Sequence, residues 1–144
     1  LRGIIAQRLA RKICDNCSID ALPSDEQMTW LQHLDPAAHT INFKTGSGCQ
    51  KCNHTGYAGR IGVFELLEMT EEMMDKLKID DAIGFAHAAK KAPGYKPLAN
   101  AALEYAKQGI TTVEEVLKLV EYIAEDEHTT ALPVSTEELE DAAV

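Results

Sequence analysis

Four cysteines, the only ones in the chain, stand in two pairs of the form C-x-x-C: Cys14 with Cys17, and Cys49 with Cys52. Two intervening residues form a tight turn, so the two thiolates of a pair can converge on one ion. Two such pairs supply the four sulfur ligands of a closed tetrahedral zinc site. Because four protein ligands leave no position for a reacting water, the pattern predicts a structural zinc ion and not a catalytic one.

The segment between the two pairs, residues 18–48, is 31 residues long. A compact zinc ribbon has about 15–20 residues there, but doubling a loop costs only about 0.6 kcal/mol of closure entropy. A structural zinc ion contributes on the order of 10 kcal/mol, so the loop length does not oppose a shared site. Disulfides and redox activity compete with this interpretation. No secretory signal supports disulfides, and a thioredoxin-type pair needs a βαβ context and leaves a second pair redundant.

Other candidate residues give weaker evidence of a functional site. His54 follows Cys52 by two positions and would become a ligand only if a cysteine were displaced, so we expect an exposed loop histidine. Arg8 and Arg11, three residues apart on a predicted helix, could reach a phosphate, although solvated helix charges are commoner. The motifs G-x-x-x-x-G-K-S/T, H-E-x-x-H and G-x-S-x-G are absent. We therefore assign no catalytic and no cofactor-binding residue to this chain.

Charge is unevenly distributed along the sequence. Residues 1–60 carry seven Lys/Arg and five Asp/Glu, a net of +2, whereas residues 61–144 carry seven and eighteen, a net of −11. Nucleic-acid affinity comes mainly from neutralised phosphates, so this balance argues against a nucleic-acid partner, although the positive end lies beside the cysteines. No run approaches the roughly 18 apolar residues of a membrane span, so we expect no direct membrane insertion.

The predicted elements give an α+β fold, mostly α. Residues 1–13 are predicted to be helical because their apolar positions fall near one face. Ser24 and Gln27 form a capping box for a helix that ends near Asp35. Further elements are a short strand around Ile41 and Phe43, a strand over residues 61–67, a helix after Thr70 with Met73, Met74 and Leu77 buried, helices over 82–91 and 98–108, and one opened by the Thr112-x-x-Glu115 box.

Three stretches of sequence resemble the C-terminal part of bacterial secretion ATPases, the hexameric motors of type II secretion and type IV pilus assembly. They are QRLARKIC at residues 7–14, GCQKCNHTGYAGRIGVFE at 48–65 and QGITTVEEV at 108–116. The resemblance covers roughly residues 1–124 and excludes the acidic tail, 125–144, which we expect to be disordered. It implies a helix leaving the ATPase core (1–12), a tetracysteine zinc subdomain (13–60), and a strand with a helical C-terminal region (61–124).

The resemblance also implies that the ATP-binding part of the parent protein lies outside this chain. The family's ATP and Mg²⁺ are held upstream of this region, so the chain, which begins at Leu1 and not at Met, is expected to be a fragment that does not hydrolyse ATP alone. The family's zinc ligands match Cys14, Cys17, Cys49 and Cys52 one by one. The implied parent is a cytoplasmic homo-hexamer, peripheral to the bacterial inner membrane, whose partners are inner-membrane platform components.

Two alternatives stay open at this point. The first is a free-standing zinc-ribbon module that binds nucleic acid or a protein partner. The second is a zinc module like that of the J-protein chaperones, because residues 49–59 are similar to its repeats. That family uses four such repeats with two metals, and only two C-x-x-C pairs occur here.

Overall fold

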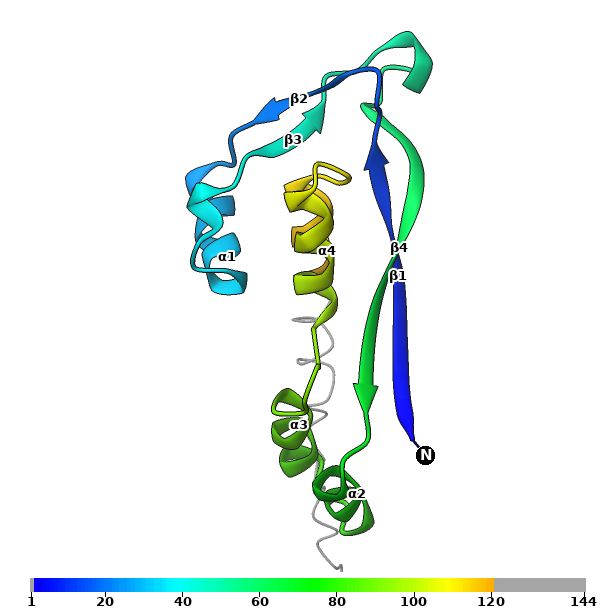
Figure 1. Ribbon diagram of the computed structural model, residues 1–144, viewed down its shortest axis with the longest axis vertical. Coiled ribbons are helices and arrows are strands. Elements are labelled where there is room, and N and C mark those ends of the chain that lie inside the picture. The colour runs from blue at the N-terminus through cyan, green and yellow to red at the C-terminus, as the bar shows by residue number, and fades with distance from the viewer. Residues whose placement is uncertain (1, 121–144) are drawn as a thin grey trace, which may run out of the picture.

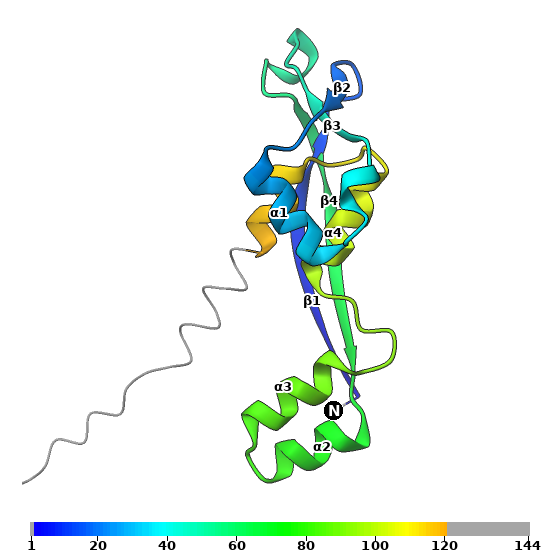
Figure 2. The same ribbon diagram turned by 90° about the vertical axis from the view of Figure 1, so that its left-hand side faces the viewer.

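The computed structural model describes residues 2–120, which form an elongated molecule built along one long two-stranded ribbon. The ribbon consists of β1 (Gly3–Ile13) and β4 (Tyr57–Glu68). The cysteine-containing loops lie at one of its ends and a pair of short helices at the other (Figures 1 and 2). The ribbon therefore connects the two ends of the molecule.

The two ribbon strands are antiparallel and stay in register from the Gly3↔Glu68 pair to the Arg11↔Arg60 pair. The register shifts between Arg11 and Ile13, immediately before the first cysteine. The prediction of a helix over residues 1–13, and hence over 1–12, is wrong. The apolar residues Ile5 and Leu9 fit helical spacing but are also both odd-numbered, so they share one face of a strand, whereas Ile13 lies beyond the register shift and is buried. Pairing with β4, far away in sequence, decides between the two.

A side arm contains β2 (Ser18–Ala21), β3 (Phe43–Gly46) and α1 (Asp25–Leu34). The predicted capping box is confirmed, because the Ser24 hydroxyl accepts from the Gln27 amide while the Gln27 side chain accepts from the Ser24 amide. The predicted short strand is present but begins at Phe43 and does not include Ile41. A 3-10 helix, Ala38–Thr40, links α1 to β3.

The main core lies around α4 (Leu98–Lys107), which Figure 1 shows between the ribbon and α1. Glu65 of β4 fixes its start: one carboxylate oxygen accepts from the Leu98 amide and the other from the Tyr95 hydroxyl, both at 2.9 Å. At its other end Lys107 pairs with Asp35, 2.7 Å away, at the end of α1. The buried members of this core are Ala10, Leu31, Ala38, Phe43, Val63, Leu98, Ala102, Leu103, Ala106, Val113 and Val116.

A second, smaller core joins α2 (Glu71–Lys78) and α3 (Ala82–Lys90) to the far end of β4. Thr70 caps α2 as expected, since its hydroxyl accepts from the Met73 amide. Met73 is fully buried, but Leu77 is half exposed, so the prediction that Leu77 belongs to the buried stripe is wrong.

The predicted α+β class, with more helix than strand, is confirmed among residues 2–120, where a further helical segment covers 113–120. No helix in this part of the chain has both the length and the apolar character needed to cross a lipid bilayer. The acidic tail, 125–144, lies outside the described residues.

The core around α4 gives a stability prediction. Leu103 is 1% exposed, so Leu103→Ala should lower the free energy of unfolding by about 2–5 kcal/mol, through lost burial and the cavity left behind. Leu22 is 98% exposed and serves as the matched control; Leu22→Ala should change the same quantity by less than about 0.5 kcal/mol. Urea denaturation followed by circular dichroism measures both, and equal effects would contradict the assignment of this core.

Candidate metal centre

The structure brings the four cysteine sulfurs together as one cluster. The distances between Sγ atoms are 3.8 Å for Cys14 to Cys49, 3.8 Å for Cys17 to Cys52 and 3.7 Å for Cys49 to Cys52. All four sulfurs lie within 4.8 Å of one another. A disulfide would require about 2.05 Å, so the four cysteines are free. A tetrahedral ion with metal–sulfur bonds of about 2.3 Å, the value for zinc, requires sulfur–sulfur edges of about 3.8 Å. The cluster is therefore placed to bind one metal ion and is compatible with structural zinc.

The loop that carries the second pair is shaped by hydrogen bonds to sulfur. Cys52 ends a 3-10 helix, Gln50–Cys52, and its sulfur accepts from the amides of Cys49 and Gly56, both at 3.3 Å. Asn53 and His54 follow in the left-handed conformation, with φ of 54° and 62°. The turn thus aims two backbone N–H groups at a sulfur, an arrangement that favours the thiolate.

These contacts give the thiols different acidities. Loss of solvent raises the pKa of Cys52, but the amides of Cys49 and Gly56 outweigh it and lower the pKa to about 6. A hydrogen bond from the Asn16 side chain lowers the pKa of Cys49. Burial raises the pKa of Cys17 to about 11. The cluster therefore holds thiolate and thiol together near neutral pH, and a bound cation would displace the remaining protons.

The two cysteine loops approach each other through backbone. The Cys14 amide donates to the Gly56 carbonyl at 2.9 Å, and the Ser47 amide donates to the Cys17 carbonyl at 2.9 Å. A Cβ atom at Gly46 would collide with the Gly56 carbonyl, so the absence of a side chain permits this approach. The positions of the sulfurs are thus set by direct contacts between segments that are distant in the sequence.

A second network ties the metal end to the main core. Glu115 is buried, and its carboxylate accepts from the backbone amide of Arg11 at 2.9 Å and from its guanidinium at 2.8 and 3.0 Å. The Thr111 hydroxyl donates to the Arg11 carbonyl at 2.7 Å, and the Ile13 amide donates to the Ile110 carbonyl at 2.9 Å. Residues 110–115 therefore hold the part of β1 that leads directly into Cys14.

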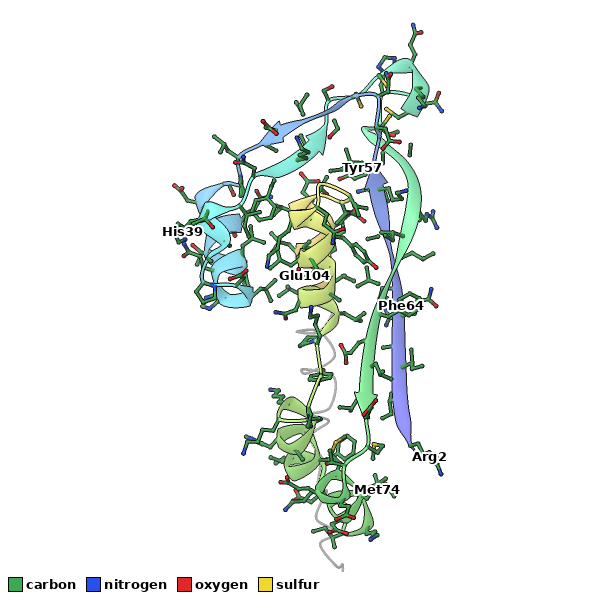
Figure 3. All side chains as sticks on the ribbon, in the orientation of Figure 1. Arg2, His39, Tyr57, Phe64, Met74 and Glu104 are labelled. Carbon is green, nitrogen blue, oxygen red and sulfur yellow. The ribbon has the colours of Figure 1, made fainter. Side chains whose placement is uncertain are left out.

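Tyr57, at the start of β4 and close to the cysteine end of the ribbon, completes this network (Figure 3). Its hydroxyl lies 2.9 Å from that of Thr112, and the Arg11 guanidinium lies 3.9 Å above its ring. Arg11 thus hydrogen-bonds Glu115 and stacks on the Tyr57 ring, which corrects the expectation of a solvated or phosphate-binding arginine. The Thr112 hydroxyl caps the Glu115 amide as expected, but the Glu115 side chain bonds Arg11.

Sequence reasoning identified the four cysteines but missed Glu115 and Tyr57 as residues that position them. The Thr112-x-x-Glu115 pattern was a visible signal, yet it pointed to a capping box, because nothing local reveals a partner 104 residues away. His54 is exposed, and among residues 2–120 it is not part of the candidate metal cluster, as expected.

Comparisons with known proteins give a consistent result. Residues 1–118 match the family model described as "Type II/IV secretion system protein". The chain is 32% identical over 117 residues to the type IV pilus assembly ATPase PilB of Thermus thermophilus, which covers 81% of this chain and 13% of that protein. It is 32% identical over 120 residues to the type II secretion system ATPase E of Vibrio cholerae, covering 83% and 23%. The chain thus spans less than a quarter of the length of these relatives.

The Arg11–Glu115 pair gives a prediction that depends on pH. Burial raises the pKa of Glu115, but the amide and guanidinium of Arg11, together with the Lys118 ammonium 2.9 Å away, outweigh it and hold the pKa below its usual value. A depressed pKa means that the stabilisation is complete above the unfolded-state value and is lost as the pH falls through the folded-state value. Glu115→Gln should therefore lower the free energy of unfolding at pH 7 by about 1–2 kcal/mol, a range reduced because Arg11 is partly exposed.

The difference in free energy of unfolding between wild type and Glu115→Gln should stay constant from pH 7 to about 5.5. It should shrink as the pH falls below 4.5, the usual pKa of a glutamate carboxyl. The neighbouring Glu114 is exposed; Glu114→Gln is the matched control and should show no such loss. Urea titrations at a series of pH values measure the difference for each protein. A difference that does not shrink at low pH would contradict the role of the carboxylate charge.

Proposed function

The chain belongs to the type II/IV secretion system protein family, and we propose that it is the C-terminal, zinc-binding part of an ATPase that powers type II secretion or type IV (MSHA-like) pilus assembly. The observation that carries the proposal is the match over residues 1–118 together with the clustered cysteines. The relatives named as ATPases are several times longer than this chain. ATP and Mg²⁺ are accordingly assigned to the remainder of the parent protein, and no catalytic residue is assigned here.

In this proposal Cys14, Cys17, Cys49 and Cys52 hold one structural zinc ion. Four thiolates complete a tetrahedral shell and leave no place for a water nucleophile. Among the described residues, the hydrophobic cluster at the cysteine end consists of the buried Cys14, Cys17 and Cys52 and the partly buried Cys49, so packing of other apolar side chains contributes little there. Metal–sulfur bonds replace the missing core and keep the two loops together.

The mechanical role follows from how this site is attached. The ribbon is continuous from the cysteine end to α2 and α3, and Glu115 fixes the strand that enters the site. A displacement of one end of the ribbon is therefore passed to the other end as a rigid-body movement and is not absorbed in a loop. We propose that the zinc module is a rigid protrusion through which ATP-driven domain rotation reaches a partner.

The partner and setting are also part of the proposal. The parent is assigned to the cytoplasm, as a homo-hexamer at the inner membrane, with inner-membrane platform components as its partners. These assignments are supported by the family and by the two relatives named above. A free-standing zinc ribbon that binds nucleic acid is not favoured, because the family match covers most of the chain and residues 61–144 carry a net charge of −11, from seven basic and eighteen acidic residues.

Metal analysis tests the zinc assignment. The purified chain should contain one zinc ion per molecule, and Cys14→Ser or Cys49→Ser should lower both zinc content and melting temperature because binding and folding are coupled. His54→Ala is the matched control and should retain the metal, since that side chain lies outside the cluster. Inductively coupled plasma mass spectrometry gives the stoichiometry. A metal-free chain that keeps its melting temperature would contradict the structural role.

The coupling role is tested in the full-length parent. Cys49→Ser should leave ATP hydrolysis in place but remove most secretion or pilus output, because the module transmits motion and does no chemistry. His54→Ala should leave both unchanged. If Cys49→Ser leaves the output intact while its zinc is lost, transmission through this module is ruled out; if the wild-type parent hydrolyses no ATP, the proposed function fails.

A further inference from the structure

The face of the ribbon that points away from α4 presents four exposed apolar side chains, with Gln7 opposite Phe64 as the polar residue among them, and it is uncovered among residues 2–120. Ile5 and Leu66 are directly opposite each other, 70% and 49% exposed. Leu9 and Phe64, on the same face by their register, are 56% and 55% exposed. The opposite face contains Ala10 and Val63, which are buried in the main core. One face of this ribbon therefore packs against the main core, whereas the other face has no packing partner among residues 2–120.

The Phe64 ring lies against the ribbon on this face. A Cβ atom placed on Gly62 would come within 2.9 Å of the Phe64 ring, so the ring lies along the ribbon over Gly62 and next to the position of Leu9. Figure 3 places Phe64 midway along β4. An exposed apolar strip along paired strands is typical of a surface that packs against another layer of a protein.

The outer edge of β1 is open over the same stretch. The Met69 amide donates to the Arg2 carbonyl. The backbone N–H and C=O groups of the even-numbered β1 residues therefore bond to β4, and those of the odd-numbered residues point toward the outer edge of the ribbon. At Arg11 and Ile13 the outward groups are satisfied by residues 110–115. At Gly3, Ile5 and Leu9 the described residues supply no partner. Charged side chains, Pro or bulges usually protect such an edge. The Arg8 guanidinium donates to the Gln7 carbonyl at 2.9 Å, whereas the outward positions Gly3, Ile5 and Leu9 have no such protection among the described residues.

We infer that this apolar face, Ile5, Leu9, Phe64 and Leu66, together with the Gly3–Leu9 edge, is an internal docking surface that packs against another domain of the same polypeptide. This rests on the proposed function, in which the chain is part of a longer ATPase. The relatives are several times longer than this chain, so family members contain the additional protein that such a surface needs. The occupant has a complementary apolar layer and a strand edge that adds to β1.

A domain packed on this surface would connect its own movement to the ribbon. The domain packed on it would hold Gly3–Leu9, while residues 110–115 hold Arg11 and Ile13 of the same strand. Movement of that domain would then be applied to β1 directly and reach Cys14 along an unbroken strand.

Hydrogen–deuterium exchange on the full-length gene product and on the 144-residue chain tests the inference. The amides of Ile5, Gln7 and Leu9 should exchange at least a hundredfold more slowly in the full-length protein. Equal exchange in the two proteins would overturn the inference, as would a gene product that is no longer than this chain. A 144-residue chain that dimerises in sedimentation and already protects these amides would assign the surface to a second copy and overturn it too.

A pair of variants checks that the apolar face is responsible. In the full-length protein Phe64→Ser should speed exchange at residues 3–9 at least tenfold, whereas Leu22→Ser, at an exposed leucine elsewhere, should not. Unchanged exchange in Phe64→Ser would overturn the role of this face. ATP hydrolysis by the wild-type protein is measured alongside: protection without hydrolysis would overturn only the proposed function, and hydrolysis without protection would overturn only this inference.

Discussion

Convergence of four sulfurs on one small volume is the constraint on which the cysteine end of this molecule depends. The two cysteine pairs are separated by residues 18–48, yet three of their sulfur–sulfur distances are 3.7–3.8 Å. Thiolates at that distance repel one another, and the surrounding loops have almost no apolar core with which to offset the repulsion. A cation that neutralises them removes this cost and connects the loops at once. The close approach of Gly46 to Gly56 shows that the backbone is already fitted to that arrangement.

Contacts between the main core and the strand that leads into Cys14 also hold the cysteine site in place. The buried carboxylate of Glu115 binds both the backbone and the side chain of Arg11, three residues before Cys14. Ribbon pairing holds the same strand along its inner edge. The metal end is thus an extension of the folded body, joined to it by short contacts on both edges of the strand that leads into Cys14.

Local sequence signals predicted much of this structure, and distant partners account for what they missed. The Ser24 cap, the Thr70 cap and the cysteine turns depend on neighbours within a few residues, and each was visible in the sequence. Residues 1–13 contain good helix-forming residues, and only the β4 partner makes them a strand. The role of Glu115 was invisible for the same reason, since Arg11 lies at the other end of the chain. Leu77 fitted the apolar spacing of its helix, but it lies outside the small second core and is half exposed.

Zinc K-edge X-ray absorption of the purified chain tests the central claim, that one tetrathiolate metal ion holds the two cysteine loops together. The structure predicts a shell of four sulfur atoms at about 2.3 Å with no nitrogen or oxygen neighbour. A shell in which nitrogen or oxygen replaces sulfur would contradict the account, because the metal would then not be held by all four cysteines.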